Sequence, residues 1–510
     1  MPSRTEAPVS LDGCSLDLDT FRAVVLERRP AVLGEPARAR VRAARQVIER
    51  SVASGEAIYG VNTGFGNLAN VPIAAADLEA LQERLVLSHA AGVGAPLDEA
   101  AVRGMLLLRA NTLARGCSGV REAVIERLLD LLGAGVHPCV PSRGSVGASG
   151  DLAPLAHLSL ALIGRGEAEW GGRRMPASEA LAAAGLEPLV LAPREGLALI
   201  NGTQATTALV ALTVLEARRL VRIADLVGAM STDAFRGTDA AFDERVHALR
   251  PYAGQRASAA NLWGLLRGSG IRESHRSGDM RIQDPYSFRC MPQVHGAVRD
   301  VVTDVERRLE IEMNAATDNP LVFAEGGVTI SGGNFHGEPM AFAADFLAIA
   351  LAELGSISER RTEKLTNDAF SGLPPFLVAH AGLNSGFMMA QVTAAALVSE
   401  NKTLAHPASV DSIPTSADKE DHVSMGMWAA IKVRQVASNV RRILAIELVA
   451  AAQGHDLLRP LASSAPLQAL HGDLRRRIAA WDRDREMAPD LERADTFLAG
   501  EIDRHLARLA

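Results

Sequence analysis

The chain has 510 residues, of which 48% are hydrophobic and only 4% aromatic, so its core must consist mainly of Ala, Leu and Val. This composition favours helices over sheets, and the length allows about three domains or one continuous helical body. The net charge is −7 at pH 7, and no long basic run offers a stripe for phosphates, so nucleic acid is excluded as an expected partner.

The cysteines give no sign of a metal site or a disulfide framework, because Cys14, Cys117, Cys139 and Cys290 are scattered without C-x-x-C spacing. We therefore expect no metal. The first residues lead into no apolar segment, and no later stretch reaches about 18 uninterrupted apolar residues. The sequence thus predicts a cytoplasmic protein that does not enter a membrane.

The sequence predicts a polar N-terminal segment that is followed by short helices up to residue 57. Residues 38–50 are strongly charged and are expected at the surface. The segment Tyr59-Gly60-Val61-Asn62-Thr63-Gly64-Phe65-Gly66 follows, and its glycines predict a loop. A turn with an aromatic plug is the simplest interpretation of this loop. Residues 81–94 predict an amphipathic helix with His89 near its C-terminal end, where a histidine usually serves the helix dipole.

A glycine-rich stretch, Arg143-Gly144-Ser145-Val146-Gly147-Ala148-Ser149-Gly150-Asp151-Leu152-Ala153-Pro154, predicts a turn that leads into a helix with Asp151 as its N-cap. Frequency alone favours a plain turn before a buried helix. A phosphate cradle fits poorly, because no Gly-Lys-Ser/Thr follows and the glycines do not match G-x-G-x-x-G. A hydrolase elbow also fits poorly, since Ser149 does not lie in G-x-S-x-G.

Another chemistry suits these residue types better. Gly150 leaves its amide nitrogen unhindered, Ala148 offers a small and accessible carbonyl group, and Ser149 can lose its hydroxyl as water. Backbone cyclisation with dehydration would give a 4-methylidene-imidazole-5-one (MIO) ring. Such a ring is an electrophile made from the chain itself, without an external cofactor.

The second half of the chain predicts mostly helices. Residues 208–230 predict a largely buried helix, whereas 253–278 are rich in Gly, Ser and Arg and predict a mobile connection. Pro285 predicts a loop from which Tyr286 and Arg289 face a cleft. From residue 297 onward long helices form a bundle, and Thr415-x-x-Asp418 resembles a capping box that opens the last of them. The expected helices include 339–365, 382–404 and 422–453.

The stretch from Pro141 to Ala156 resembles the signature of the MIO-dependent aromatic amino acid ammonia-lyases and aminomutases. The resemblance extends from about Tyr59 to Pro489. It implies a mainly α, aspartase-like fold with a central bundle of long helices and a loop-rich N-terminal part that bears the MIO. It also implies a homotetramer whose active sites draw on more than one subunit. We expect the MIO-bearing part over residues 1–205 and the long-helix bundle over 206–510.

The same resemblance implies roles for single residues. Tyr59 corresponds to the tyrosine of the family's Tyr-Gly-x-x-Thr-Gly-Phe-Gly loop, which acts in proton transfer. Asn201, by itself part of an ordinary turn, corresponds to the asparagine that lies against the MIO. Arg289, by itself a surface ion-pair former, corresponds to the arginine that holds the substrate carboxylate, with Tyr286 and Gln283 supporting the geometry.

Substrate choice depends on Ser88-His89, because histidine lyases typically carry Ser-His at this position, tyrosine lyases His-Leu and phenylalanine lyases Phe-Leu. The resemblance also places Phe335 in the wall of the aromatic pocket and Glu420 near the substrate. The chain departs from many bacterial histidine lyases at Met291, His295 and Lys419.

A site that offers His89 and Glu420 to an imidazole would leave both groups poorly paired around a phenyl ring. Sites built to hydrogen-bond a ligand reject the analogue that lacks the polar group by about 10⁴-fold. The expected reaction is therefore deamination of L-histidine to trans-urocanate. The alternatives are a tyrosine or phenylalanine ammonia-lyase, an MIO-dependent 2,3-aminomutase, or a helical scaffold without catalysis.

Overall fold

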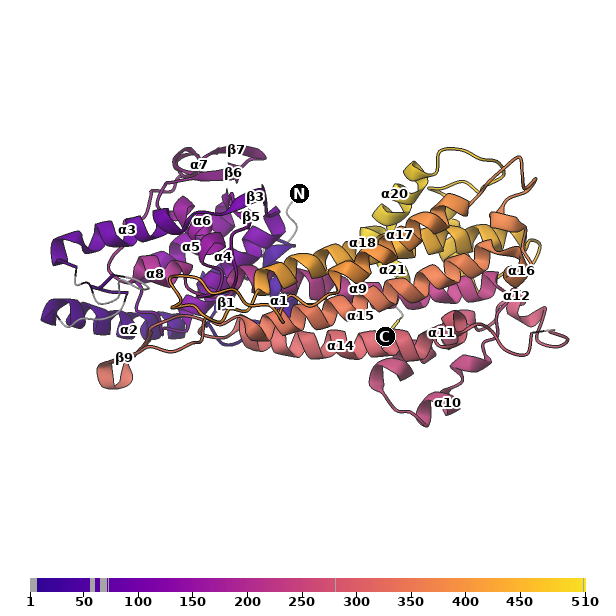
Figure 1. Cartoon of the computed structure of the whole chain (residues 1–510), viewed down its shortest axis with the longest axis horizontal. Coiled ribbons are helices and arrows are strands. Elements are labelled where there is room, and N and C mark those ends of the chain that lie inside the picture. Colours follow the sequence, from indigo (N-terminus) through magenta and orange to yellow (C-terminus); the bar gives the residue numbers. More distant parts are fainter. Residues whose placement is uncertain (1–6, 56–59, 65–70, 72, 280, 508) are drawn as a thin grey trace. The chain divides into compact units, whose positions relative to one another are not determined.

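The computed structural model describes the chain except for residues 1–6, 56–59, 65–70, 72, 280 and 508 (Figure 1). The described chain divides into two compact units. The first comprises Met1–Leu215, Glu306–Asp345 and Pro407–Ile431, and the second Glu216–Val305, Phe346–His406 and Lys432–Ala510. The long helices α9 (Gln204–Ala234), α14 (Met291–Met313), α15 (Glu338–Thr366) and α18 (Gly426–Leu457) contribute residues to both units. The division predicted at residue 205 stays a prediction.

The first unit is built around α4 (Glu99–Ala114), in which every residue from Ala101 onward is buried. Asp98 starts this helix by accepting a hydrogen bond from the backbone N–H of Ala101. An apolar sequence on all sides suits a helix that is enclosed by others. The helices that pack against it are α1 (Leu18–Val25), α2 (Glu35–Ser54), α5 (Glu122–Ala134) and α6 (Leu152–Leu162).

The remaining helices of this unit are α3 (Leu78–His89), α7 (Ala177–Ala183) and α8 (Glu195–Ile200), with 3₁₀ turns at Ala75–Asp77 and Glu325–Gly327. Its strands are short and form small sheets. β1 (Val9–Leu11) pairs in parallel with β2 (Ala31–Leu33), whereas β3 (Val93–Pro96) pairs antiparallel with β5 (Pro141–Arg143). The other antiparallel sheets are β4 (His137–Pro138), β6 (Glu167–Trp170) and β7 (Arg173–Pro176), and β8 (Leu321–Phe323) with β9 (Val328–Ile330).

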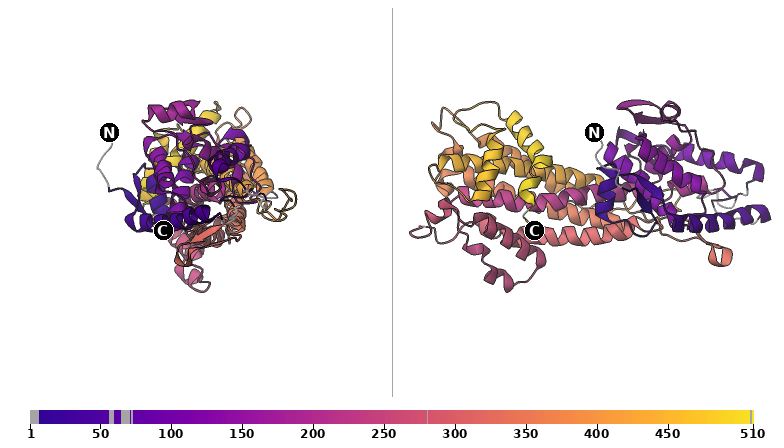
Figure 2. Two further views of the ribbon diagram at one scale, coloured as in Figure 1. Left: turned by 90° about the vertical axis from the view of Figure 1, so that its left-hand side faces the viewer. Right: turned by 180° about the vertical axis from the view of Figure 1, so that it is seen from behind.

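The second unit is a bundle in which parts of α9, α14, α15, α17 (Met388–Leu404) and α18 lie side by side (Figures 1 and 2). Its apolar core contains a cluster of buried polar groups. Glu447 of α18 accepts hydrogen bonds from Ser231 of α9 and from Ser358 of α15, both at 2.6 Å. Arg361 of α15 forms a fully buried ion pair with the same carboxylate. Losing one partner of such a pair is strongly destabilising, so these contacts fix how the helices align.

Shorter helices surround this bundle. They are α10 (Glu244–Ala248), α11 (Ala253–Leu266), α12 (Gly270–Glu273), α13 (Tyr286–Arg289), α16 (Asp368–Ser371), α19 (Ala465–Arg475), α20 (Ala488–Thr496) and α21 (Asp503–Leu506). Two 3₁₀ turns at Ala240–Phe242 and Pro375–Leu377 and a π turn at Phe497–Glu501 complete the described part of this unit.

The mobile connection predicted over 253–278 is wrong, because this stretch forms α11 and α12. The small residues of α11 reflect close packing: a Cβ added at Gly254 would lie 2.2 Å from the carbonyl oxygen of Gly296 on α14. Leu262 and Leu265 of the same helix are buried. Composition therefore suggested mobility where the backbones of two helices approach each other.

The long helices predicted over 208–230 and 339–365 are confirmed by α9 and α15, while α17 and α18 begin later than predicted. The capping box at Thr415 and Asp418 is wrong. Thr415 instead donates a hydrogen bond to the Glu420 carboxylate at 2.8 Å, and α18 begins only at Gly426. The short helices predicted up to residue 57 are confirmed by α1, but the prediction is wrong for α2, which is 20 residues long.

By length and composition α15 could cross a membrane, but 61% of its most apolar stretch is buried inside the protein. A core helix of a bundle has these properties.

All cysteines are free.

Candidate active site

The predicted electrophile lies in a tight turn directly before α6. Gly147 and Gly150 have φ angles of +72° and +73°, which side chains rarely tolerate. A Cβ at Gly150 would lie 2.1 Å from the carbonyl oxygen of Gly202, and one at Gly147 would lie 2.1 Å from Ser424 Oγ. The turn therefore requires glycine on both sides of Ala148 and Ser149.

Several helices begin around this turn. The Asp151 N–H at the start of α6 donates to the Gly202 carbonyl at 2.7 Å, just before α9. A Cβ at Gly426, the first residue of α18, would lie 3.3 Å from Thr206 of α9 and 3.6 Å from the Gly337 carbonyl that precedes α15. Helix N-termini carry partial positive charge, so this arrangement favours a group that gains negative charge.

The atoms needed for ring closure are available. In the described part of the chain, neither the Gly150 N–H nor the Ala148 carbonyl has a hydrogen-bond partner. Ser149 Oγ is 3.1 Å from Glu420 Oε1, to which it donates. Ala148 and Gly150 are buried, while Ser149 remains partly accessible. These residues fit the self-formed ring that the sequence predicted.

Asn201 lies beside this turn and is buried. Its side-chain oxygen Oδ1 has no hydrogen-bond partner among the described residues. Its backbone carbonyl accepts a hydrogen bond from Arg109 at 2.8 Å. An unpartnered buried amide oxygen is costly unless a ligand meets it, so Asn201 is suited to contact a substrate.

The predicted substrate contacts of the first unit lie on three segments. His89 ends α3, and its Nδ1 is bonded to the Leu85 carbonyl at 2.9 Å, which leaves Nε2 as an acceptor. Phe335 is half-buried in a turn before α15. Glu420 lies beside Ser149, as described above. Tyr59 lies outside the described residues, so its role stays a prediction.

The remaining predicted contacts belong to the second unit. Tyr286 and Arg289 lie on the four-residue helix α13 that follows Pro285, not on the predicted loop, because proline is well tolerated at a helix start. The Arg289 guanidinium stacks 4.5 Å from the centre of the Tyr286 ring, and its Nε donates to the Asp284 carbonyl. Tyr286 and Gln283 are exposed.

Met291 and His295, where the chain departs from bacterial histidine lyases, are fully buried in the second unit. Met291 packs against Gly228 of α9, and His295 Nδ1 is 2.8 Å from the Asp225 carboxylate. Both side chains therefore contribute to the packing of the bundle.

The family follows from a comparison with known proteins. A family model described as aromatic amino acid lyase matches residues 16–476, which is most of the chain. The chain belongs to the aromatic amino acid lyase family. The mainly α, aspartase-like fold predicted from the sequence is confirmed by this membership and by the helical units.

Similar members of the aromatic amino acid lyase family include the histidine ammonia-lyase of Anaeromyxobacter sp. (strain K), which is 55% identical over 96% of this chain and 98% of its own length. Among solved structures, histidine ammonia-lyase from Trypanosoma cruzi is 45% identical, with a TM-score of 0.91 over 98% of this chain and 95% of that one. Tyrosine aminomutase from Streptomyces globisporus is 40% identical, with a TM-score of 0.93 over 99% of both chains.

The sequence did not reveal the residues that support the turn at Ala148-Ser149-Gly150. Arg109 of α4 is fully buried, and besides Asn201 it binds the Ala198 carbonyl and Gln204 Oε1. Burial lowers the pKa of Arg109 to about 10. The available signal was the presence of Arg103 and Arg109 within a largely apolar helix, where a charge must have buried partners. Among the described residues, no group of three or more His, Cys, Asp or Glu could hold a metal ion.

Asp151 also has another role than the predicted one. It occupies the N-cap position of α6, but its carboxylate does not bond that helix. It accepts hydrogen bonds from Thr206 N and Thr206 Oγ1, both at 2.8 Å, and thereby caps α9. Burial raises the pKa of Asp151 to about 6, and it also raises the pKa of Glu312, which accepts from Thr203 Oγ1 at 2.6 Å.

The raised pKa predicts a specific pH dependence of stability. Below pH 4 the Asp151 carboxyl is protonated in both folded and unfolded chains, whereas above pH 6 folding must bury its charge. The contribution of Asp151 to the free energy of unfolding is therefore full below the unfolded pKa of 3.8 and falls as pH rises through about 6. One pKa unit corresponds to about 1.4 kcal/mol, so the expected loss is about 3 kcal/mol.

Denaturant unfolding measures this effect when the Ser149→Ala chain is compared with the Ser149→Ala/Asp151→Asn double variant. Neither chain can form the ring, so ring formation does not differ between them. The Asn variant, which cannot ionise, should gain about 3 kcal/mol relative to its parent between pH 4 and pH 7. Parallel pH profiles of the two chains would contradict the assignment.

Proposed function

We propose that this chain catalyses the non-oxidative deamination of L-histidine to trans-urocanate and ammonia in the cytoplasm. The observation that carries this proposal is the carboxylate of Glu420, which lies 3.1 Å from Ser149 Oγ. This places a hydrogen-bond acceptor at the predicted electrophile, where an imidazole has a polar edge and a phenyl ring has none. Identities of 45–55% with histidine ammonia-lyases of other organisms support the same substrate.

The electrophile forms from three residues of the chain. The Gly150 amide nitrogen attacks the Ala148 carbonyl carbon, a C–N bond closes the five-membered ring, and the carbonyl oxygen leaves as water. The Ser149 hydroxyl leaves with the proton of its Cα as a second water. Once formed, the MIO supplies an electron sink that turns the substrate's amino group into a leaving group.

The other residues bind the substrate and move its proton. Arg289 holds the substrate carboxylate through its planar guanidinium, with Tyr286 and Gln283 keeping that group in place. Tyr59 accepts the proton from the β-carbon. Asn201 and the helix N-termini around the turn stabilise the developing negative charge, as preorganised donors do in other enzymes.

Selectivity against phenylalanine comes from polar groups that an imidazole can satisfy and a phenyl ring cannot. His89 has Nε2 free to accept, because Nδ1 is bonded to Leu85. Glu420 is held by Thr415 and accepts from the second ring N–H of the protonated imidazole. Phe335 provides the apolar wall of the pocket. A phenyl ring would leave both acceptors unpaired, and a site built around such groups rejects an analogue that cannot bond them.

Incubation with L-histidine, L-tyrosine and L-phenylalanine, with each product identified, tests the proposal. We expect urocanate from histidine, with kcat/KM at least about 10³-fold above that for phenylalanine. Preferred deamination of tyrosine or phenylalanine would contradict the roles of His89 and Glu420.

An aminomutase activity is the second candidate, because tyrosine aminomutase from Streptomyces globisporus is also similar to this chain. Such an enzyme would return ammonia to the β-carbon. A β-amino acid among the products would favour this activity, and an α,β-unsaturated acid with free ammonia favours the lyase.

We also propose a homotetramer whose active sites combine residues of different subunits. Exposed apolar side chains gather on α15 and α17 of the second unit, namely Phe346, Ile349, Met388, Met389 and Val392. A surface of this kind usually contacts another chain. Light scattering of the purified protein should give four times the chain mass of 54.0 kDa; a monomer would contradict the assembly.

Subunit complementation tests the shared site. Ser149→Ala and Arg289→Ala chains should each be inactive, but tetramers that combine them should recover part of the activity. Recovery is expected only if Ser149 and Arg289 of one active site come from different chains. Mixed tetramers as inactive as the parents would contradict the shared arrangement.

A further inference from the structure

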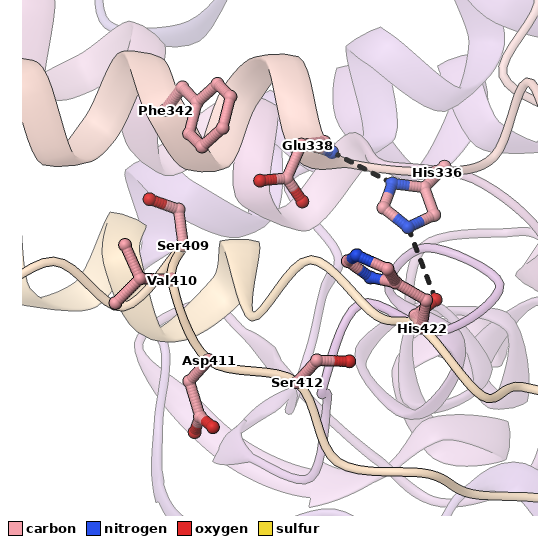
Figure 3. A pocket seen from close by; sticks show the side chains of 8 residues that line it. All are labelled: His336, Glu338, Phe342, Ser409, Val410, Asp411, Ser412 and His422. Carbon is pink, nitrogen blue, oxygen red and sulfur yellow. Dashed lines mark hydrogen bonds between the residues drawn. The ribbon is translucent and has the colours of Figure 1, made fainter.

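His336 connects two segments that carry proposed substrate contacts (Figure 3). The first is the turn at 333–337, which contains Phe335. The second is the segment at 415–424, which contains Glu420. The His336 ring bonds to Glu338 N through Nδ1 at 3.4 Å and to the His422 carbonyl through Nε2 at 3.3 Å. Its ring also meets the His422 ring edge-on, with centres 5.8 Å apart.

The two hydrogen bonds require one particular tautomer of the His336 imidazole. Glu338 N–H is a donor, so Nδ1 must accept. The His422 carbonyl is an acceptor, so Nε2 must carry the proton and donate. His336 therefore acts in its neutral form as a bridge between the two segments.

The 415–424 segment needs such external support. Ser416, Ala417 and Asp418 have φ angles of 52°, 53° and 63°, a left-handed conformation that non-glycine residues adopt only when the surroundings impose it. Other contacts of the segment include the hydrogen bonds from Val423 N to Ser412 Oγ at 3.0 Å and from Ser149 Oγ to Glu420 at 3.1 Å. Neither of these bonds joins it to the Phe335 turn, which the segment meets at His422 and where Ser424 packs against Gly337.

Packing between the two segments is incomplete around His336 and His422. Beside the His336–His422 contact lies a cavity of about 550 Å³. Figure 3 shows the side chains that line it, namely His336, Glu338, Phe342, Ser409, Val410, Asp411, Ser412 and His422. A segment that borders a cavity has fewer packing contacts to hold it, so directed hydrogen bonds determine its position.

We propose that His336 is a positioning residue for substrate binding. It holds the Phe335 turn and the Glu420 carboxylate at a fixed separation and so sets how tightly the imidazole of the substrate is bound. This inference rests on the proposed function. Because His336 acts through Glu420, its loss should weaken substrate binding more than it slows the chemical step.

Two variants separate hydrogen bonding from ring packing. His336→Phe keeps an aromatic ring against His422 but makes neither hydrogen bond. His336→Gln keeps both, because its amide can accept from Glu338 N and donate to the His422 carbonyl. We expect KM for L-histidine to rise about 5- to 20-fold in the Phe variant, with kcat within about 3-fold of the wild type. The Gln variant should stay within about 3-fold of the wild-type KM.

A double variant tests whether the effect passes through Glu420. In chains that carry Glu420→Gln, adding His336→Phe should cause no further rise in KM. Intact mass should show ring formation in every variant. His336→Ala is the second variant if the Phe chain does not fold.

The outcomes distinguish this inference from the proposed function. A wild type that deaminates histidine while the Phe and Ala variants keep its KM would contradict the inference alone. Equal losses in the Phe and Gln variants would also contradict it. A wild type that leaves histidine unchanged would contradict both.

Discussion

Replacing Ser149 by alanine should abolish the loss of water from the chain and, with it, the enzymatic activity. The wild-type chain should weigh less than its sequence mass by two water molecules, and the Ser149→Ala chain should keep at least the water that the hydroxyl provides. Loss of a single stabilising donor in an active site costs about 10²- to 10³-fold in kcat, so loss of the electrophile itself should cost at least about 10³-fold. Intact mass spectrometry and a urocanate assay measure the two effects.

Ser142→Ala is the matched control for this experiment. Ser142 is half-buried on β5, close in sequence to Ser149 but outside the turn. Its variant should lose both waters and stay fully active. An unmodified wild-type mass in active protein would refute the self-formed electrophile, whatever the activity of the Ser149→Ala chain.

The turn at Ala148-Ser149-Gly150 could be predicted from the sequence because its chemistry is local. Glycine before and after the pair is required by positive φ angles, and such a requirement leaves a mark on the residue types. The long helices were predictable for a similar reason. Their apolar periodicity extends over many residues, so small errors at the ends do not hide them.

Contacts between distant segments could not be predicted in this way. Asp151 has the residue type and position of an N-cap for α6, yet its carboxylate caps α9, more than 50 residues further along. The small residues of α11 suggested a loop, because close packing of two backbones and a flexible connection demand the same residue types. In both cases the residue types of a short stretch reflect a contact with another helix. That helix cannot be identified from the stretch itself.

Arg109→Met should lower both stability and catalysis. Arg109 is fully buried and binds the carbonyl groups of Asn201 and Ala198 as well as Gln204 Oε1. Methionine fills similar space but leaves these oxygens without their donor, which should reduce the free energy of unfolding by about 3–5 kcal/mol. Asn201 should then shift in position, and misplacement of a contacting group by about 1 Å can cost about 10²-fold in kcat.

Arg103→Met on the same helix separates these two effects. Arg103 is also buried and binds three backbone carbonyls, those of Val24, Val25 and Leu132, but none of them belongs to the candidate active site. The two variants should therefore lose similar stability by denaturant unfolding. At a temperature where both are folded, Arg103→Met should keep kcat within about 3-fold of the wild type, while Arg109→Met should not. Equal loss of kcat in both would mean that Arg109 supports only the fold. A difference of about 10²-fold would mean that a buried cation in α4 determines where Asn201 meets the substrate.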